Sequence, residues 1–316
     1  MKQLALLFIA ALLLCETHAQ DGKILSKEPI VLADSLFVQF GRADKAFADK
    51  LRSIDFFRIT YLSDDLKVTG YLAEPKAPGK YPCIISNRGG NRDFGQWDSV
   101  SMAYFLGHMA SWDYVAIASQ YRGNDGGEGT EEFGGKDLND VLALIPALAQ
   151  LPKADTSRIG IEGGSRGGMM TYLALKASCK FKAAVVTAGL ANAFKSIEAR
   201  PEMETEVFAQ LIPDYHANKE KELTARSAVL WADEMCKTTP LLIMHGSADW
   251  RVDPPQVFEL VQKLYAAKHP TRFILYEGAD HGIREFRVES FAEKRRFFDR
   301  YLRDGEKWPS LDPHGM

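Results

Sequence analysis

One segment of the sequence, Gly163–Gly168, has the residue types and spacing of a nucleophilic serine site. It reads GGSRGG and holds the single G-x-S-x-G pattern of the chain, centred on Ser165. A short apolar stretch, 159–162, predicts a buried strand before it, and a helical pattern follows from about Arg166, which is the context this pattern requires. Glycines are needed because neighbouring Cβ atoms would clash in so sharp a turn. We predict that Ser165 is a nucleophile; the alternative is a glycine-rich turn with an ordinary serine.

A serine needs a general base to become nucleophilic, and the base needs an acid that orients it. In the α/β-hydrolase arrangement the acid follows the serine in sequence, and the histidine follows the acid. Asp249 and His281 stand in these places, each in a loop just after a predicted strand. The sequence therefore predicts the triad Ser165, Asp249 and His281.

Two neighbouring residues compete for these roles. Asp253 precedes Pro254 at the start of a predicted helix, so an N-cap position explains it without catalysis. His245 precedes the acid in sequence, and we expect it to support the loop of Asp249.

The negatively charged oxygen of an acyl-transfer intermediate needs two hydrogen-bond donors. One is expected to be the backbone N–H of Arg166, which follows the nucleophile at the start of the helix. The other should come from the loop after the predicted strand 81–86. The sequence of this loop, NRGGN, offers backbone N–H groups that glycine leaves uncovered. We assign it to Gly90.

Substrate-binding residues are less sharply indicated. Arg88, Arg122 and Arg166 could gather near the site and bind a carbonyl or carboxylate. The alternative is that they are solvated or paired with Asp125, Glu131 or Glu132. Aromatic side chains that could line an acyl pocket are Tyr104, Phe105, Trp231 and Trp250. Of all these, Arg88 and Trp250 are the predicted substrate contacts, Trp250 because it adjoins the acid.

Predicted strands and helices alternate over most of the chain and must position these residues. Apolar runs typical of strands occur at 56–62, 66–72, 81–86, 114–119, 159–162, 181–187, 240–244 and 272–276. The alternation predicts an α/β fold, a doubly wound and mostly parallel sheet of the α/β-hydrolase type, with chemistry at the carboxyl ends of the strands. We expect a lead-in at 20–50, a catalytic domain at 51–305, and a mostly helical cap inserted at about 190–237.

The composition is that of an ordinary globular protein, because 46% of the 316 residues are hydrophobic and 26% are charged. The net charge of −3 and the lack of a basic stripe give no indication of nucleic-acid binding. No Cys or His pairs have metal-ligand spacing, so neither a metal nor another cofactor is predicted.

The first residues predict export. Lys2 precedes an apolar run, and small residues before Gln20 predict cleavage of a signal peptide, 1–19, after Ala19. The mature protein would be secreted or periplasmic, without stable membrane insertion. A retained anchor and a lipoprotein modified at Cys15 are the alternatives. The cysteines left after cleavage, Cys83, Cys179 and Cys236, allow at most one internal disulfide and do not specify its pairing.

Taken together, the motifs resemble the catalytic domain of the prolyl oligopeptidase family of serine peptidases, from about Phe57 to Leu302. They are the 66–75 hairpin, the Tyr121-Arg122-Gly123 turn, the GGSRGG segment, and the segments that begin at His245 and Gly278. The resemblance implies an α/β-hydrolase fold, short-peptide or small-molecule substrates, no cofactor, and the same three triad roles. It does not indicate an oligomeric state.

The sequence departs from the family in three respects. Arg166 stands where the family usually has tyrosine, and Arg88 stands where some relatives supply a tyrosine hydroxyl to the oxyanion. The β-propeller that precedes this domain in well-studied relatives is not expected here. Similar standalone domains also resemble carboxylesterases and carbohydrate-ester hydrolases, so ester hydrolysis is the main alternative. A non-catalytic binding protein is a remote one, because such proteins usually lose a triad member.

Overall fold

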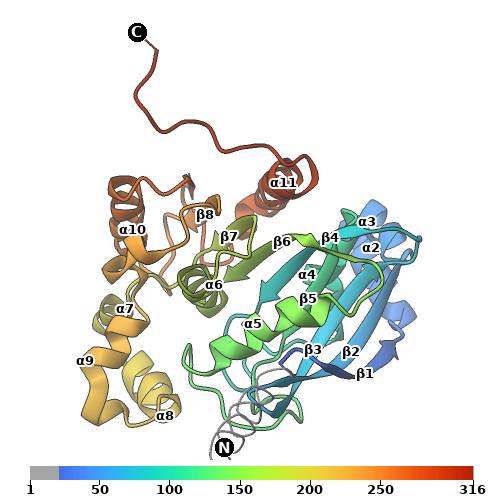
Figure 1. Cartoon of the computed structure of the whole chain (residues 1–316), viewed down its shortest axis with the longest axis horizontal. Coiled ribbons are helices and arrows are strands. Elements are labelled where there is room, and N and C mark those ends of the chain that lie inside the picture. Colours follow the sequence, from blue (N-terminus) through green and yellow to red (C-terminus); the bar gives the residue numbers. More distant parts are fainter. Residues whose placement is uncertain (1–20, 316) are drawn as a thin grey trace, which may run out of the picture.

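Residues 21–315 are described by a computed structural model, so the predicted signal peptide, 1–19, lies outside the described residues. They fold around a nine-stranded sheet with the strand order β1-β2-β3-β5-β4-β6-β7-β8-β9 (Figure 1). The strands are β1 (Ile24–Ile30), β2 (Ile54–Ser63), β3 (Leu66–Pro75), β4 (Tyr81–Asn87), β5 (Val115–Ser119), β6 (Ala154–Gly164), β7 (Ala183–Thr187), β8 (Leu241–Gly246) and β9 (Thr271–Tyr276).

Strands β4 to β9 run parallel, whereas β1, β2 and β3 form an antiparallel edge. The predicted doubly wound, mostly parallel sheet is thereby confirmed. Because the strands that carry Ser165 and Asp249 are both in the parallel part, their carboxyl ends meet at one edge of the sheet.

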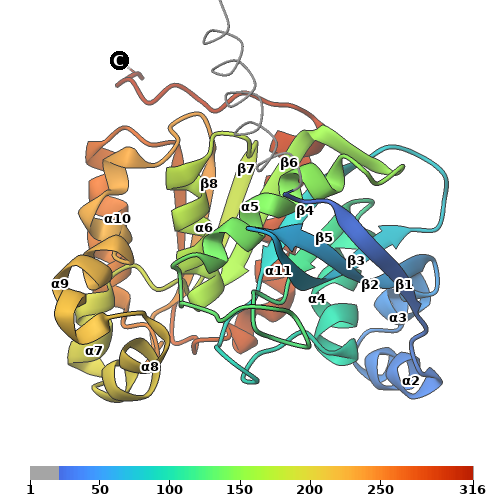
Figure 2. The ribbon, with the colours of Figure 1, turned by 60° about the horizontal axis from the view of Figure 1, so that its bottom comes forward.

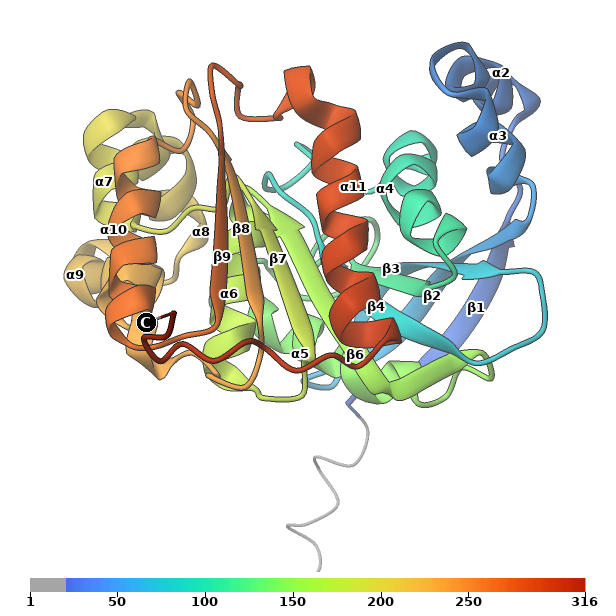
Figure 3. The same cartoon turned by 90° about the horizontal axis from the view of Figure 1, so that it is seen from above.

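Helices cover both faces of the sheet (Figures 2 and 3). Helices α5 (Asp137–Leu148), α6 (Arg166–Ala177) and α10 (Pro254–Ala266) contribute to one hydrophobic cluster. Helices α4 (Ser99–Ser111) and α11 (Arg287–Phe298), with α2 (Asp34–Ala43) and α3 (Lys45–Leu51), contribute to the other. Consecutive strand residues alternate between the clusters, so that Ile84 packs on one face and Ile85 on the other.

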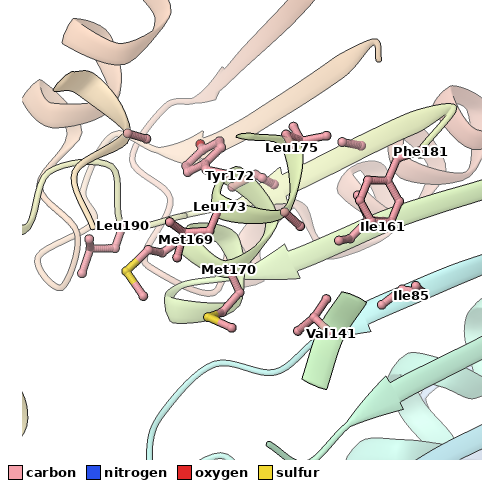
Figure 4. Packing of buried hydrophobic residues seen from close by; sticks show 14 of the residues in the cluster. Ile85, Val141, Ile161, Met169, Met170, Tyr172, Leu173, Leu175, Phe181 and Leu190 are labelled. Atoms are coloured by element: carbon pink, nitrogen blue, oxygen red, sulfur yellow. The ribbon is translucent and has the colours of Figure 1, made fainter. Parts of the chain in front are cut away.

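Helix α6, which follows Ser165, is buried along nearly its whole length. In Figure 4 its Met170 lies toward Val141 of α5, and Ile85 and Ile161 of the strands belong to the same cluster. Close packing of this kind makes truncation costly, at about 2–5 kcal/mol for a buried Leu, Ile or Met cut to Ala. The core therefore fixes the helix whose first turn borders the nucleophile.

Two regions differ from the sequence-based expectation. Residues 21–50, which show no clear periodicity, form β1, α2 and α3, and β1 pairs with β2. Strand β6 begins at Ala154 rather than near Ile159, because its polar first half pairs with the start of β4 at Tyr81. In both places backbone pairing builds a strand where the hydrophobic pattern is weak.

The insertion between β7 and β8 is mostly helical and gathers beside α10 (Figures 1 and 3). It contains α7 (Ala193–Ala199), the π-helical turn η1 (Met203–Phe208), α8 (Ala209–Leu211) and α9 (Tyr215–Ala225). A disulfide between Cys179 and Cys236 joins the region after α6 to the end of this insertion, and Cys83 is a buried free thiol. Between residues 21 and 315 no helix combines the length and the apolar character needed to cross a membrane.

Candidate active site

Ser165 occupies a strained turn between β6 and α6. Its backbone angles are φ 57° and ψ −123°, a conformation that L-residues rarely adopt. A Cβ on Gly163 would lie 2.2 Å from the Gly167 carbonyl oxygen, and a Cβ on Gly167 would lie 2.1 Å from the Asn87 carbonyl oxygen. The flanking glycines are therefore sterically required, as the motif predicts.

Asp249 and His281 are directly hydrogen-bonded, the Nδ1–H of the imidazole donating to Asp249 Oδ2 at 2.8 Å. The other carboxylate oxygen accepts the backbone N–H groups of Arg251 at 2.9 Å and Val252 at 3.0 Å. Burial alone would raise the pKa of Asp249, but His281 and these N–H groups together hold the pKa below its ordinary value. Asp249 is thus an ionised acceptor that orients the imidazole and leaves Nε2 available.

His245 closes the loop that carries the acid. Its Nε2–H donates to the Val252 carbonyl oxygen at 2.8 Å and lies 3.3 Å from Asp249 Oδ2. Burial lowers the pKa of His245, so the ring is neutral at physiological pH. Asp253 is at the N-cap of α10, although its side chain makes no capping hydrogen bond.

The two predicted oxyanion donors border the same pocket as Ser165. It is a pocket of about 140 Å³. Gly90 has φ +68°, and a Cβ there would lie 2.0 Å from the Phe94 carbonyl oxygen. Within residues 21–315, neither the N–H of Gly90 nor that of Arg166 donates a hydrogen bond. Both groups are therefore available to a ligand, and the α6 N-terminus adds a favourable dipole.

The side chain of Arg166 is buried behind this loop. Its guanidinium pairs with Glu131 and Asp137 and lies over the rings of Tyr121, at 4.7 Å, and Phe133, at 4.6 Å. It also donates to the Gly90 carbonyl oxygen at 3.0 Å. The charge of Arg166 is thus neutralised within the protein.

Arg88 and Arg122 are also turned inward, and each residue is only 3% exposed. The Arg88 guanidinium donates to four backbone carbonyl oxygens, those of Gln120, Gly89, Phe94 and Arg92. Arg122 pairs with Asp140 and Asp64. This placement favours the interpretation that the three arginines are paired inside the protein, although most of their partners differ from those expected. The Arg88 side chain is not placed to contact a substrate.

The predicted aromatic residues separate into two groups. Trp250 is 65% exposed, beside the pocket residue Arg251. Tyr104 and Phe105 belong to α4 and pack against other aromatic rings. Trp231 is buried, with the Lys176 ammonium over its ring. Of these four residues, only Trp250 lies next to a residue of the pocket lining, and it is not itself in that lining.

The cap supplies pocket residues that the sequence did not indicate. These are Ser196, Arg200, Met203 and Val207, with Leu190 at its start. They belong to no motif, and only the folded insertion brings them next to Ser165. Within the described part of the chain, no cluster of three His, Cys, Asp or Glu residues could hold a metal ion.

Comparisons with known proteins find similar sequences and folds. Residues 99–305 match the sequence profile of the prolyl oligopeptidase family. The chain is 30% identical over 239 residues to YtmA, an uncharacterized peptidase of Bacillus subtilis, and the match covers 75% of this chain and 90% of YtmA.

Two solved structures illustrate the fold. The acylaminoacyl peptidase of Pyrococcus horikoshii matches with a TM-score of 0.70 and 24% identity, over 85% of this chain and 45% of that one. The acetyl xylan esterase of Paenibacillus sp. R4 matches with a TM-score of 0.62 and 20% identity, over 87% of this chain and 97% of that one. The chain thus spans less than half of the first protein and nearly all of the second.

Proposed function

Since this chain belongs to the prolyl oligopeptidase family, we propose that it hydrolyses amide bonds of short peptides, with Ser165 as nucleophile. The observation that carries the proposal is the 2.8 Å hydrogen bond between His281 and Asp249, at the same edge of the sheet as the strained Ser165. Membership of the family supports a serine peptidase or hydrolase. The triad roles and the size of the substrate are our proposal.

In the first half of the reaction, Ser165 Oγ attacks the substrate carbonyl carbon while His281 Nε2 takes the hydroxyl proton. The carbonyl electron pair moves onto oxygen, which the N–H groups of Arg166 and Gly90 bind. When the C–N bond breaks, His281 returns the proton to the departing amine. Asp249 remains ionised and holds the Nδ1–H throughout.

In the second half, water replaces the amine. His281 removes a proton from that water as its oxygen attacks the acyl-enzyme carbon, and the same two N–H groups bind the oxyanion. Collapse of the intermediate breaks the bond to Ser165 Oγ, which recovers its proton from His281. The products are an acid and an amine, and the enzyme is unchanged.

Two arginines position the oxyanion loop in this scheme. Arg88 Nη1 donates to the Gly89 carbonyl oxygen at 3.4 Å, which belongs to the same peptide unit as the Gly90 N–H. Arg166 Nη1 donates to the Gly90 carbonyl oxygen of the next unit, at 3.0 Å. Each side chain thus restrains one peptide plane beside the nucleophile.

Hydrolysis of carboxylesters, including carbohydrate esters, is the second candidate. The position at which some relatives of the family supply a tyrosine hydroxyl to the oxyanion is occupied by Arg88, which is buried and bonded to backbone. Esters are intrinsically easier to cleave than amides, and the same triad would suffice.

The deciding experiment compares an amide and an ester that share one N-acetylated aminoacyl group, with wild type and Ser165→Ala side by side. Amide turnover that disappears in Ser165→Ala supports the proposal. Ester turnover without amide cleavage selects the second candidate. Failure of a fluorophosphonate to label the folded wild-type protein at Ser165 would overturn both.

Export is a separate part of the proposal and rests on the sequence of residues 1–19. Expression of the full chain in a bacterial host should yield a mature protein that begins at Gln20 in the periplasm or medium. N-terminal sequencing of the purified protein checks this, and an intact Met1 would contradict it.

A further inference from the structure

Two arginines at the mouth of the pocket have no part in the triad. Arg200 comes from the end of α7 in the cap, and Arg251 comes from the loop after β8, and both line the pocket that contains Ser165. Within residues 21–315 no carboxylate lies within 4 Å of the Arg251 guanidinium. Arg200 pairs with Glu202 at 3.0 Å, but the side chain of Glu202 is 55% exposed.

The charged side chains that line this pocket are all positive. Its described lining includes three arginines and neither aspartate nor glutamate. The third, Arg166, is already neutralised by the buried Glu131 and Asp137. Water partly screens the half-exposed pair of Arg200 with Glu202, and Arg251 has no such pair among the described residues, so the pocket keeps positive charge for a ligand.

Both guanidinium groups are held beside one aromatic ring, that of Trp250. Both lie over the ring of Trp250, Arg200 at 5.4 Å and Arg251 at 5.1 Å from its centroid. Arg200 also donates to the Arg251 carbonyl oxygen at 3.3 Å, and Arg251 lies 5.8 Å from the centroid of Phe94. Because both residues line the same pocket, their positive charges repel each other in the free enzyme, and an anion bound in that pocket would relieve the repulsion.

We infer that Arg200 and Arg251 select substrates that carry a carboxylate close to the scissile bond. The inference rests on the proposed function, because it names the substrate class of the same pocket. Guanidinium groups suit a carboxylate because they bind it with paired, charge-assisted hydrogen bonds. A protonated amine in the same place would meet two positive charges in a pocket whose described lining holds no acidic residue.

The carboxylate could belong to the acyl part of the substrate or to its leaving group, so the experiment has two arms. The first compares the 4-nitroanilides of N-acetyl-glutamate and N-acetyl-glutamine, which have nearly the same shape. The second compares 3-carboxy-4-nitroanilide with 4-nitroanilide, both on N-acetyl-glutamine. If only esters are cleaved, α-methyl esters of the same two acyl groups replace the first arm.

In at least one arm, kcat/KM should be about tenfold higher for the charged substrate at low salt. This preference should shrink as salt is added, since the charges are partly exposed. The double variant Arg200→Gln/Arg251→Gln should bring the ratio close to one while it still hydrolyses the neutral substrate. Lys195→Gln on α7 is the matched control, because it removes an exposed positive charge of the cap and should keep the preference.

Equal rates in both arms, or a preference that survives in the double variant, would overturn the inference and leave the proposed function intact. The arm that shows the preference identifies the source of the carboxylate. Absence of Ser165-dependent turnover of every neutral substrate would instead overturn the proposed function, and this inference with it.

Discussion

Arg166 donates a hydrogen bond from its buried guanidinium to the carbonyl oxygen of Gly90, at 3.0 Å. The residue that follows the nucleophile therefore contributes to the site in two ways. Its backbone N–H is one proposed oxyanion donor, and its side chain restrains the loop that carries the other. Glu131 and Asp137 fix that side chain in turn, so a buried ionic network stands directly behind the catalytic loop.

Replacing Arg166 with Leu should reduce both stability and turnover. The substitution leaves the buried Asp137 without its cation and leaves Glu131 with only Arg88, at 3.9 Å, and breaking a buried pair typically costs about 3–5 kcal/mol. Chemical denaturation measures the loss. Arg166→Lys keeps the charge but loses the planar fork. Compared with the Leu variant, it should therefore regain more of the stability than of the kcat. Equal recovery of both would show that the network acts on stability alone.

Gly90→Ala should lower kcat by about 100- to 1000-fold, the usual effect of losing one oxyanion donor. The added Cβ would lie 2.0 Å from the Phe94 carbonyl oxygen at a positive φ, so the loop must move. Steady-state kinetics with a neutral substrate checks this. Gly305→Ala is a control for strain alone, because Gly305 also has a positive φ, has open space around the new Cβ and lies outside the loops of the proposed triad. Similar losses in both variants would contradict a specific role for Gly90.

Acid should destabilise the fold through His108. Burial lowers the pKa of this histidine from 6.5 to about 4, and its ring stacks on Phe47 with centroids 3.6 Å apart. Between those pH values His108 binds a proton in the unfolded chain but not in the folded chain. The free energy of unfolding should therefore fall as pH decreases from 6.5 to 4, by up to about 3 kcal/mol from this group.

The matching variant is His108→Phe, which keeps an aromatic ring against Phe47 but cannot be protonated. Urea denaturation at several pH values should show a shallower loss of stability for it than for wild type. An unchanged pH dependence would mean that other groups, such as the buried His269 whose pKa burial also lowers to about 4, dominate.

Removal of the disulfide should destabilise the protein without changing its triad. Cys179 and Cys236 are 57 residues apart, and a cross-link over a loop of that length is worth about 4 kcal/mol by chain entropy. The double variant Cys179→Ser/Cys236→Ser should unfold at lower urea concentration. In the unreduced and denatured mature chain, thiol titration should count one free group, Cys83, and a count of three would show that the bridge does not form.

The three proposed triad residues could be singled out from the sequence because each belongs to a local pattern. Ser165 needs glycines around it. Asp249 follows the buried strand β8 and His281 follows the edge strand β9, in a fixed chain order. These requirements are visible in a few consecutive residues. The sheet was predictable for the same reason, since buried parallel strands appear as apolar runs.

The rest of the site depends on contacts between distant segments. Of the acids expected to pair with the three arginines, Glu131 does pair with Arg166, whereas Asp125 pairs with Arg58. Nothing in the sequence of the insertion marks Arg200 as a pocket residue. Such partners are set by how loops cross in three dimensions, so a motif search does not find them.

The two ends of the cap are attached to the same helix. At its beginning, the Leu190 N–H donates to the carbonyl oxygen of Ser165 at 3.2 Å, where α6 starts. At its end, the bridge from Cys236 returns to Cys179, just after α6 finishes. The cap is thus attached at both of its ends to the helix that follows the nucleophile. A hinge at either end would disturb the nucleophile turn or the bridge, so these two attachments favour bending within the cap, between α7 and α9, as the way in which the pocket opens.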